Sequence, residues 1–371
     1  MSGVDVNHLI TEHLDLWTST IKSKATTGRG SSKKVELYGI KKLRQLIIDL
    51  AVQGKLIEQN TGDEPASVLL EKVYKEKAFQ IENKVIKKQK QSTTISPDER
   101  LFEIPQTWEF CRIQDICILE NGDRSKNYPN KSVLTETGVP FVNAGHLENG
   151  RINHSEMTFI PSERFDILNG GKFTTGDILY CLRGSLGKAA IVDGVEKGAI
   201  ASSLVIIRLF LDIDREYMLN FLRSTYAYKL IKKYDNGTAQ PNLSATDLNK
   251  FVIPLPPLSE QKRIVAKANE LMALCDKLEA QTEQSLEAHQ QLVETLLNTL
   301  TNSQDANSLA QNWNRIAEHF DTLFTTEKSI DTLEETILQL AVMGKLVPQD
   351  PNDEPASVLL EKIADEKEQL I

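Results

Sequence analysis

Four glycine- and asparagine-rich stretches of the sequence carry most of the side chains that could do chemistry. Arginine, asparagine and glutamine can each form two hydrogen bonds to the edge of a guanine or adenine base in the major groove. Glycine next to Arg183 or Lys188 would also let backbone amides approach a phosphate. The stretches therefore predict a nucleic-acid contact surface, with the candidate residues Asn121, Arg124, Lys126, Asn127, Tyr128, Asn143, His146, Arg183, Ser185, Lys188, Asn236, Thr238, Gln240 and Asn242.

The same stretches admit a simpler interpretation. The dipeptides Asn121-Gly122, Asn149-Gly150, Gly170-Gly171 and Asn236-Gly237 are typical of turns, and the neighbouring charges could simply be solvated. For any single residue this interpretation stands beside the contact interpretation.

The sequence lacks the patterns of common catalytic sites. The segment Gly184 to Ala189 (GSLGKA) has the wrong spacing for a phosphate-binding loop, and no hydroxyl follows its lysine. GxSxG, HExxH and the deaminase signature are absent, and so is the Asp/Asn-Pro-Pro-aromatic tetrapeptide of amino-methyltransferases. His13 and His319 occur in matching contexts, EHLD and EHFD, which indicates a repeated helix and not a catalytic pair. We therefore expect no catalytic residue.

Metal binding is not indicated either. The four cysteines, at positions 111, 117, 181 and 275, form no CxxC pair and have no histidine at ligand spacing. We expect buried thiols and no metal site.

Composition describes an ordinary soluble protein, with 371 residues, 40% hydrophobic and 26% charged. The sequence shows neither a long apolar run nor a secretory signal, so we expect a cytoplasmic protein without membrane contact. The net charge of -9 is concentrated at one end, because residues 257–371 carry 9 Lys+Arg against 21 Asp+Glu. Since phosphate neutralisation normally drives nucleic-acid affinity, DNA binding would require local basic patches or a basic partner.

The stretch from Leu43 to Ile81 is repeated from Leu333 to Ile371 at a constant offset of 290 residues. Both copies read LAVxGKL and then DEPASVLLEK. The period is far longer than the roughly 20–50 residues of a solenoid repeat. The duplication therefore predicts two copies of one helical connector with a single large domain between them.

Hydrophobic periodicity and turn signals divide the chain into five parts and predict an α+β fold. The central domain contains β-branched runs such as SSLVIIRLF, and one helix is expected through Met218 to Ile231. We expect an α/β to mostly β domain flanked by helical regions. The parts are an N-terminal helical region at 1–91, a linker at 92–103, the central domain at 104–256, a long helix at 257–303 and a helical connector at 304–371 that repeats 13–81.

The long helix carries one apolar seam. Neither glycine nor proline interrupts the chain from Ser259 to beyond Ser303, and a helix of some 40 residues would be about 60 Å long. Its apolar residues recur at spacings of three and four and indicate a coiled coil, although a long helix packed on its own domain would show the same pattern. The seam residues are Ile264, Ala268, Leu271, Cys275, Leu278, Leu292 and Leu296.

Five segments resemble parts of the specificity subunits of type I restriction-modification enzymes. The segment GTAQPNLS at Gly237 to Ser244, followed by IPLPPLSEQKRIV at Ile253 to Val265, resembles the end of a target recognition domain and the start of the next conserved helix. IPQTWEFCRIQDI at Ile104 to Ile116 is similar to the start of such a domain, and the two connectors are similar to the conserved regions. The resemblance covers nearly the whole chain.

The resemblance implies a non-catalytic subunit. Members of this family carry two recognition domains, each reading one half of a split DNA target, held apart by antiparallel helices that dock two methyltransferase subunits. Restriction and translocase subunits join through these, and S-adenosylmethionine is expected on the methyltransferase partner, with no cofactor on this chain. The candidate interface residues are Leu50, Gly54, Leu70, Ile264, Leu271, Leu278, Leu292, Leu296, Leu340, Gly344 and Leu360.

The sequence departs from the family pattern because it holds one recognition domain. It is expected to be either the N-terminal half of a longer subunit or a half-subunit that dimerises through residues 260–300, which would make the DNA target an interrupted palindrome. The alternative function is a truncated or regulatory half-subunit that binds methyltransferase subunits without productive DNA recognition.

Overall fold

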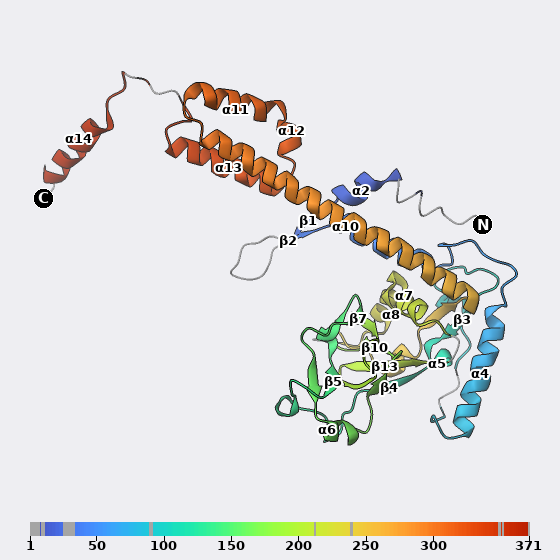
Figure 1. The fold of residues 1–371 in the computed structure, drawn as a ribbon. Helices are drawn as coiled ribbons and strands as arrows, with labels where there is room; N and C mark the ends of the chain where they lie inside the picture. The colour runs from blue at the N-terminus through green and yellow to red at the C-terminus, as the bar shows by residue number, and fades with distance from the viewer. Residues whose placement is uncertain are drawn as a thin grey trace. The chain divides into compact units, whose positions relative to one another are not determined.

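The computed structural model describes residues 8, 12–24, 34–88, 92–210, 213–237, 240–347, 350 and 352–369. The chain divides into two compact units, Met1–Glu279 and Ala280–Ile371. Figure 1 labels their helices and strands. The strands are β1 (Lys22–Lys24), β2 (Lys34–Glu36), β3 (Glu109–Arg112), β4 (Cys117–Asn121), β5 (Val139–Val142), β6 (Leu147–Glu148), β7 (Gly150–Ile152), β8 (Thr158–Ile160), β9 (Lys172–Thr174), β10 (Ile178–Cys181), β11 (Ala189–Ile191), β12 (Lys197–Ile200), β13 (Leu204–Leu209) and β14 (Val252–Leu255).

The helices of the described residues include one of 44 residues, α10, which crosses the boundary between the two units. This is the long helix that the uninterrupted stretch after Ser259 predicted. The helices are α2 (Leu14–Ser19), α3 (Tyr38–Val52), α4 (Ala66–Glu82), α5 (Ile113–Ile116), α6 (Ser162–Asp166), α7 (Arg215–Arg223), α8 (Thr225–Tyr234), α9 (Ala245–Leu248), α10 (Leu258–Thr301), α11 (Ala306–Glu318), α12 (Phe320–Leu323), α13 (Glu327–Val342) and α14 (Ala356–Gln369).

Two sheets form the centre of unit 1. A six-stranded sheet has the order β4-β13-β10-β11-β7-β6, and a four-stranded sheet has the order β8-β5-β12-β9. The side chains of β10 and β13 alternate between two clusters, as successive residues of a strand must. Leu179 and Ile206 join one cluster, which also contains Phe173 of β9 in the second sheet, whereas Ile178 and Ile207 join the other, which contains residues of α7, α8 and α9. These two strands are therefore buried on both faces, and the α+β prediction is confirmed.

One predicted helix is divided in the structure. The sequence indicated a continuous helix through Met218 to Ile231, but α7 ends at Arg223 and α8 begins at Thr225. Ser224 has extended backbone angles, and its hydroxyl accepts a hydrogen bond from the Ala227 amide and donates one to the Phe221 carbonyl. Serine favours this capping role over a helix interior, which explains the break.

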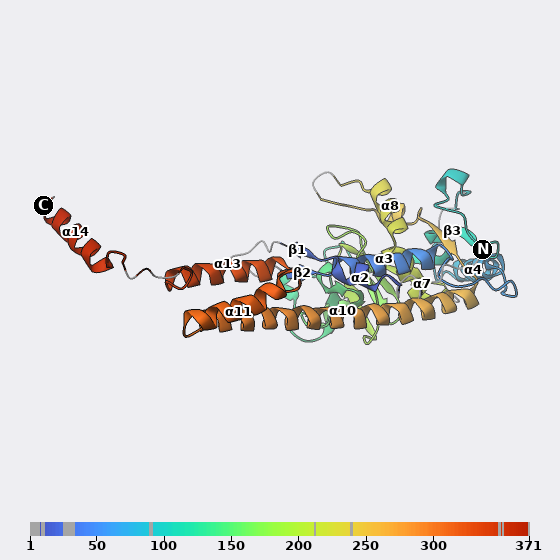
Figure 2. The ribbon, with the colours of Figure 1, turned by 90° about the horizontal axis from the view of Figure 1, so that it is seen from above.

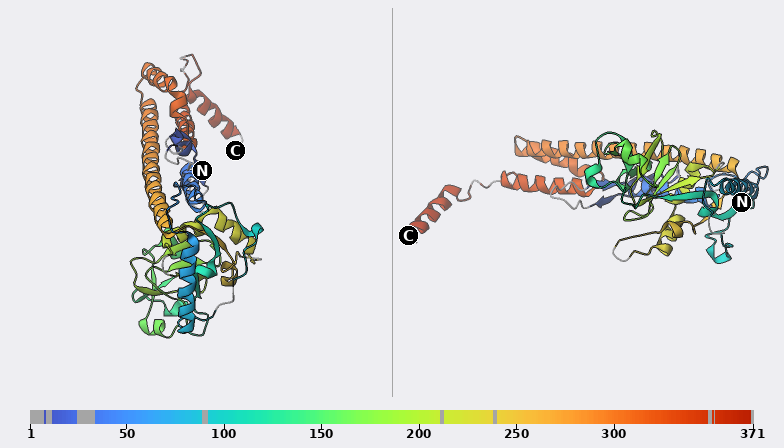
Figure 3. Two further views of the ribbon diagram at one scale, coloured as in Figure 1. Left: turned by 90° about the vertical axis from the view of Figure 1, so that its right-hand side faces the viewer. Right: turned by 90° about the horizontal axis from the view of Figure 1, so that it is seen from below.

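The helix α4 packs on the central domain, as the left view in Figure 3 shows. Leu69, Leu70 and Val73 are buried in the same cluster as Ile113 and Ile116. The first connector copy is thus part of the core of unit 1.

The helix α3 also binds its own unit. Asp49 accepts hydrogen bonds from the amide and the hydroxyl of Thr225, at the start of α8, where a carboxylate complements the helix dipole. Arg44 forms ion pairs with Asp276 at 2.7 Å and with Glu279 at 2.6 Å, both on α10. Figure 2 shows α3 running beside this part of α10.

The predicted linker at 92–103 is held against the domain in its described residues. Arg112 donates to the carboxylate of Glu99 at 3.0 Å and to the carbonyl oxygens of Thr93 and Lys250. The hydrogen bond from Arg112 lowers the pKa of Glu99 to about 2, although partial burial opposes this shift. The segment therefore works as a strap fixed by an ion pair.

Unit 2 has its own small core. Val293, Leu297 and Leu300 of α10 pack with residues of α11, α12 and α13, among them Ile316 and Leu340. The predicted continuation of the seam is wrong at Leu292, which is 51% exposed while Val293 is 1% exposed, whereas Leu296 is partly buried against this core.

The first part of the seam is also covered within the chain. Ile264 and Leu271 are fully buried, and Cys275 is 1% exposed. The chain itself therefore covers this part of the seam, and the alternative of a long helix packed on its own domain describes this part of α10.

Candidate nucleic-acid interface

Three of the four predicted stretches leave the six-stranded sheet at the same edge. β4 and β10 are both antiparallel to β13, so they run in the same direction, and Asn121 pairs with Val205, which pairs with Tyr180. The segments after Asn121 and after Cys181 therefore start side by side. β7 is parallel to β11, with Gly150 opposite Ala190, so the segment that precedes β7 reaches this edge as well. We call residues 121–128, 143–149, 183–188 and 236–242, as far as they are described, the loop edge.

Hydrogen bonds join the second, third and fourth stretches. The Arg183 guanidinium donates to the side-chain oxygen of Asn242 at 3.2 Å, and the Gly184 amide donates to the Pro241 carbonyl at 3.1 Å. The Lys188 ammonium lies 3.4 Å from the Ala144 carbonyl. Residues that are about 100 positions apart in the sequence thus form one surface.

The first stretch is built around a buried carboxylate. Asp123 accepts hydrogen bonds from the backbone amides of Ser125 and Asn169. Burial alone would raise the pKa of Asp123, but these hydrogen bonds lower it. Arg124 and Lys126 flank this support, are exposed, and form no hydrogen bond or ion pair within the part of the chain that the structure describes. Among the predicted contact residues, these two cations are therefore the most available to a ligand.

Several predicted contact residues instead make contacts inside the domain. His146 is buried, its Nδ1 accepts from the Asn143 amide and its Nε2 lies 3.0 Å from the Glu156 carbonyl. Asn143 caps the short helical turn 144–146 by accepting from the Gly145 amide. The ring of Tyr128 packs on Phe141. The expectation that His146 faces DNA is therefore wrong for this conformation, because both ring nitrogens are occupied inside the domain.

The fourth stretch is tied to Asp235. Its carboxylate accepts from the amides of Gly237 and Asn242, which lowers its pKa. Asn236 donates to Asp247, and Gln240 is exposed. Thr238 lies outside the described residues.

The remaining predicted contact residues are at the surface. Asn121, Arg183, Ser185 and Lys188 are exposed, and Asn127 is partly buried with its amide donating to the Ile167 carbonyl. The negative charges of Asp123 and Asp235 are both engaged by backbone amides. The exposed side chains of the loop edge are therefore mainly cationic or amide groups, which suit phosphate oxygens and base edges.

The helix α8 adds cations that the sequence interpretation left without a role. Lys229, Lys232 and Lys233 are exposed, and the Lys232 ammonium lies 5.0 Å from the ring centre of the exposed Tyr228. This helix touches the loop edge, because a Cβ built on Gly187 would lie 3.0 Å from Ile231. The spacing of the three lysines, which places them on one exposed face of the helix, could have indicated this from the sequence.

The structure places the predicted interface residues in three environments. Leu50, Gly54, Leu70, Ile264 and Leu271 are buried in unit 1, whereas Leu340 is buried in unit 2. Leu278 and Leu296 are partly buried, and Leu292, Gly344 and Leu360 are exposed. The two connector copies are therefore not equivalent surfaces. Leu70 is wrong as an interface residue for this conformation, since it belongs to the core that also contains Ile113 and Ile116.

Other kinds of site find little support. All four cysteines are free and buried, as predicted, and burial raises the pKa of each thiol. Among the described residues, no group of three His, Cys, Asp or Glu side chains is arranged to hold a metal ion. In the same residues, no helix has the length and apolar character needed to cross a membrane.

Comparison with known proteins relates the chain to one family. Residues 105–288 match the family described as type I restriction modification DNA specificity domain. The chain is 44% identical over 372 residues to the EcoAI specificity subunit of Escherichia coli, a match that covers 99% of this chain and 62% of that protein. It is 42% identical to the EcoEI specificity subunit of Escherichia coli over 99% of this chain and 61% of that protein.

A crystal structure of the HsdS subunit from Thermoanaerobacter tengcongensis aligns with a TM-score of 0.39 and 18% identity, covering 72% of this chain and 62% of that one. The chain spans about three fifths of the length of the curated relatives that it matches. On the domain match and the similarity along nearly its full length, this chain belongs to the specificity subunits of type I restriction-modification enzymes.

Proposed function

We propose that the recognition domain of this chain reads one half of a bipartite DNA target through the loop edge. The observation that carries the proposal is the convergence of separate polar stretches at one end of the six-stranded sheet. Loops held by a rigid sheet can place arginine and amide side chains on base edges, and this is how direct readout is achieved. The domain contributes binding alone in this proposal, and catalysis belongs to its partners.

Charge supports the same role. The domain as a whole has no net charge over residues 104–256, yet Arg124, Lys126, Lys188 and the lysines of α8 are exposed at or beside the loop edge. Such a local concentration of cations can neutralise phosphates even in an acidic chain. Methyltransferase subunits would add further phosphate contacts.

The helical parts have a second role in the proposal. They hold methyltransferase subunits, which bind S-adenosylmethionine, and restriction and translocase subunits join through these. The exposed second connector copy, with Leu359, Leu360 and Ile363 each more than half exposed, offers surface for such assembly. Pairing of two copies through residues 260–300 stays a prediction, and the burial of Ile264 and Leu271 argues against it.

Base contacts and phosphate contacts can be separated by one experiment. The chain and its methyltransferase partner are titrated with duplexes that carry the target or single-base variants of it, and binding is followed by fluorescence anisotropy. Arg124→Ala should cost roughly 1–3 kcal/mol on the target and relax the choice of base at one position. Arg315→Ala serves as the control, because Arg315 is exposed on α11 in unit 2, outside the recognition domain.

Equal loss on every duplex would make Arg124 a phosphate contact. Complex formation with the methyltransferase subunits without any DNA shift would contradict the proposal and support the regulatory half-subunit.

A further inference from the structure

The turn at residues 167–171 joins α6 to β9 and contains the Gly170-Gly171 dipeptide. Its backbone lies directly on the first stretch of the loop edge. A Cβ built on Gly171 would lie 2.7 Å from the Cα of Gly122 and 3.1 Å from the amide nitrogen of Asp123. Gly171 also has a left-handed φ of 74°, which favours glycine. A side chain at Gly171 would therefore push the turn away from the loop edge.

Hydrogen bonds hold the turn against the same stretch. The Asp123 carboxylate accepts from the Asn169 backbone amide at 2.6 Å, and the Asn127 side chain donates to the Ile167 carbonyl at 2.9 Å. Both bonds engage the backbone of the turn. They fix its position and leave the side chains of Ile167 and Asn169 available.

A buried leucine anchors the turn between these two side chains. Leu168 is 5% exposed and belongs to the cluster that contains Phe141 and Phe165. Its neighbour Ile167 is 50% exposed. Asn169 is exposed as well, and its side-chain amide forms no hydrogen bond within the part of the chain that the structure describes. The turn thus presents one aliphatic and one amide group to solvent beside the loop edge.

Charge indicates which part of a DNA duplex would suit this turn. Residues 167–171 carry no charge, and the preceding residue, Asp166, is acidic and exposed. Phosphate oxygens are bound chiefly by cations and are repelled by a carboxylate. The exposed cations Arg124 and Lys126 of the adjoining stretch can bind phosphates instead. The turn is therefore suited to base edges and not to the phosphate backbone.

The two exposed side chains match the groups that one base pair presents in the major groove. An asparagine amide oxygen can accept from the N6 amino group of adenine while its nitrogen donates to N7. An aliphatic side chain can contact the 5-methyl group of thymine, which the other three bases lack. An amide and an aliphatic group side by side are therefore complementary to an A·T pair.

We propose that the turn at residues 167–171 reads one A·T pair of the DNA target, with Asn169 on the adenine edge and Ile167 against the thymine methyl group. The turn acts as a fifth reading segment of the loop edge, so its role rests on the proposed function and names a base pair that the domain selects.

Base replacement in a selected duplex tests the assignment of Asn169. The chain with its methyltransferase partner selects its preferred duplex from a randomised pool, and each A·T pair of that duplex is then replaced by G·C. Fluorescence anisotropy should show that one replacement weakens binding of the parent chain by roughly 5- to 150-fold, the discrimination of a contact with two hydrogen bonds. Asn169→Ala should bind the original duplex more weakly and should no longer distinguish A·T from G·C at that position alone.

Uracil in place of thymine at the same position tests the assignment of Ile167. Uracil lacks only the 5-methyl group, so the parent chain should bind about fourfold more weakly, as expected for one apolar carbon that is no longer buried. Ile167→Ala should bind the thymine and uracil duplexes equally.

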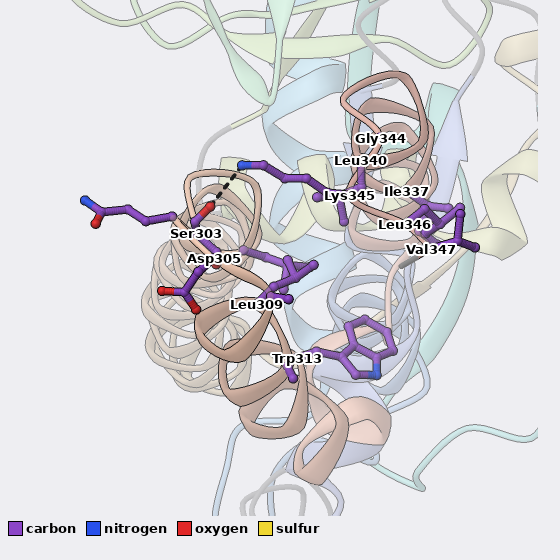
Figure 4. A pocket seen from close by; sticks show the side chains of 14 residues that line it. Ser303, Asp305, Leu309, Trp313, Ile337, Leu340, Gly344, Lys345, Leu346 and Val347 are labelled. Atoms are coloured by element: carbon purple, nitrogen blue, oxygen red, sulfur yellow. Dashed lines mark hydrogen bonds between the residues drawn. The ribbon is translucent and has the colours of Figure 1, made fainter. Parts of the chain in front are cut away.

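A control variant and a stability measurement separate base reading from a structural role. Asn314→Ala is the matched control, because Asn314 is an exposed asparagine on α11 in unit 2, next in sequence to Trp313 at the cavity shown in Figure 4. It should leave the preference at every position unchanged. Asn169→Ala retains the backbone amide that donates to Asp123, so its melting temperature should stay within about 2 °C of the parent value.

Four results would overturn the assignment of the A·T pair to this turn. They are a selected motif without an A·T pair, an unchanged preference in Asn169→Ala, an equal loss of binding on every duplex, and the same uracil effect in Ile167→Ala as in the parent chain. A parent chain that selects no motif at all would overturn the proposed function as well. A parent motif that both variants retain would overturn the role of the turn alone.

Discussion

Leucine-to-alanine substitutions at matched positions of the two connector copies compare how much each copy contributes to the free energy of unfolding. Leu70 and Leu360 occupy the same position of the repeat, yet Leu70 is 8% exposed and Leu360 is 65% exposed. Leu70 packs in the cluster that includes Cys111 and Ile116, so its truncation leaves a cavity in the core of unit 1. The pair offers a test within one chain.

The expected magnitudes follow from burial. Truncation of a buried leucine costs about 2–5 kcal/mol, and the slight exposure of Leu70 places it near 2–3 kcal/mol. In a unit of this size each 1 kcal/mol lowers the melting temperature by roughly 2–4 °C, so Leu70→Ala should lower it by about 4–12 °C. Leu360→Ala should change the free energy of unfolding by less than about 0.5 kcal/mol.

Differential scanning calorimetry of the isolated chain provides the measurement, and far-UV circular dichroism at low temperature checks that both variants are folded. Equal shifts in the two variants, or a larger shift in Leu360→Ala, would refute the inference that only the first copy is packed into the recognition domain.

Two further predictions concern the strap and α8. Because the folded pKa of Glu99 is about 2 and its ordinary value is 4.5, the Glu99–Arg112 pair contributes stability that is present above pH 4.5 and is lost as the pH falls towards 2. The contribution is at most about 3 kcal/mol, and Glu99→Gln should remove this part of the pH dependence in urea unfolding. In the second prediction, Lys232→Gln should weaken DNA binding by the same factor on every duplex. It should also reduce the slope of log K against log salt by about 1 for one lost phosphate contact. An unchanged slope would exclude α8 from the interface.

The sequence was sufficient to predict the elements whose signals are local. The uninterrupted stretch after Ser259 became α10, and the β-branched run at Leu204 to Leu209 became the buried strand β13. The division of 218–231 into two helices was missed because Ser224 acts through its own capping hydrogen bonds.

The phase of the seam in α10 was wrong for a geometric reason. The prediction extended a repeat of 3.5 residues from Leu278 to Leu292, but a straight helix has 3.6 residues per turn and drifts by about 20° per heptad. Val293 therefore lies nearer than Leu292 to the side of Leu271, and it is Val293 that is buried.

The candidate site depended on information that no single stretch contains. The residues around Asn121 and Arg183 do not indicate which strands pair. The loops after these strands come together because β4 and β10 both pair with β13. His146 likewise contacts the carbonyl of Glu156, ten residues further along the chain. The unequal burial of Leu70 and Leu360, in nearly identical local sequence, shows that their surroundings decide their environment.

Selection from a pool of duplexes with randomised bases tests the central claim most directly. The chain is purified with its methyltransferase partner, bound duplexes are recovered and sequenced, and the same selection is run with an Arg124→Ala and Arg183→Ala double variant. The account predicts enrichment of a motif of about three or four base pairs for the recognition domain, with altered preference at one or two positions in the variant. Recovery of duplexes without a common motif, or the same motif with unchanged preference in the variant, would contradict the account.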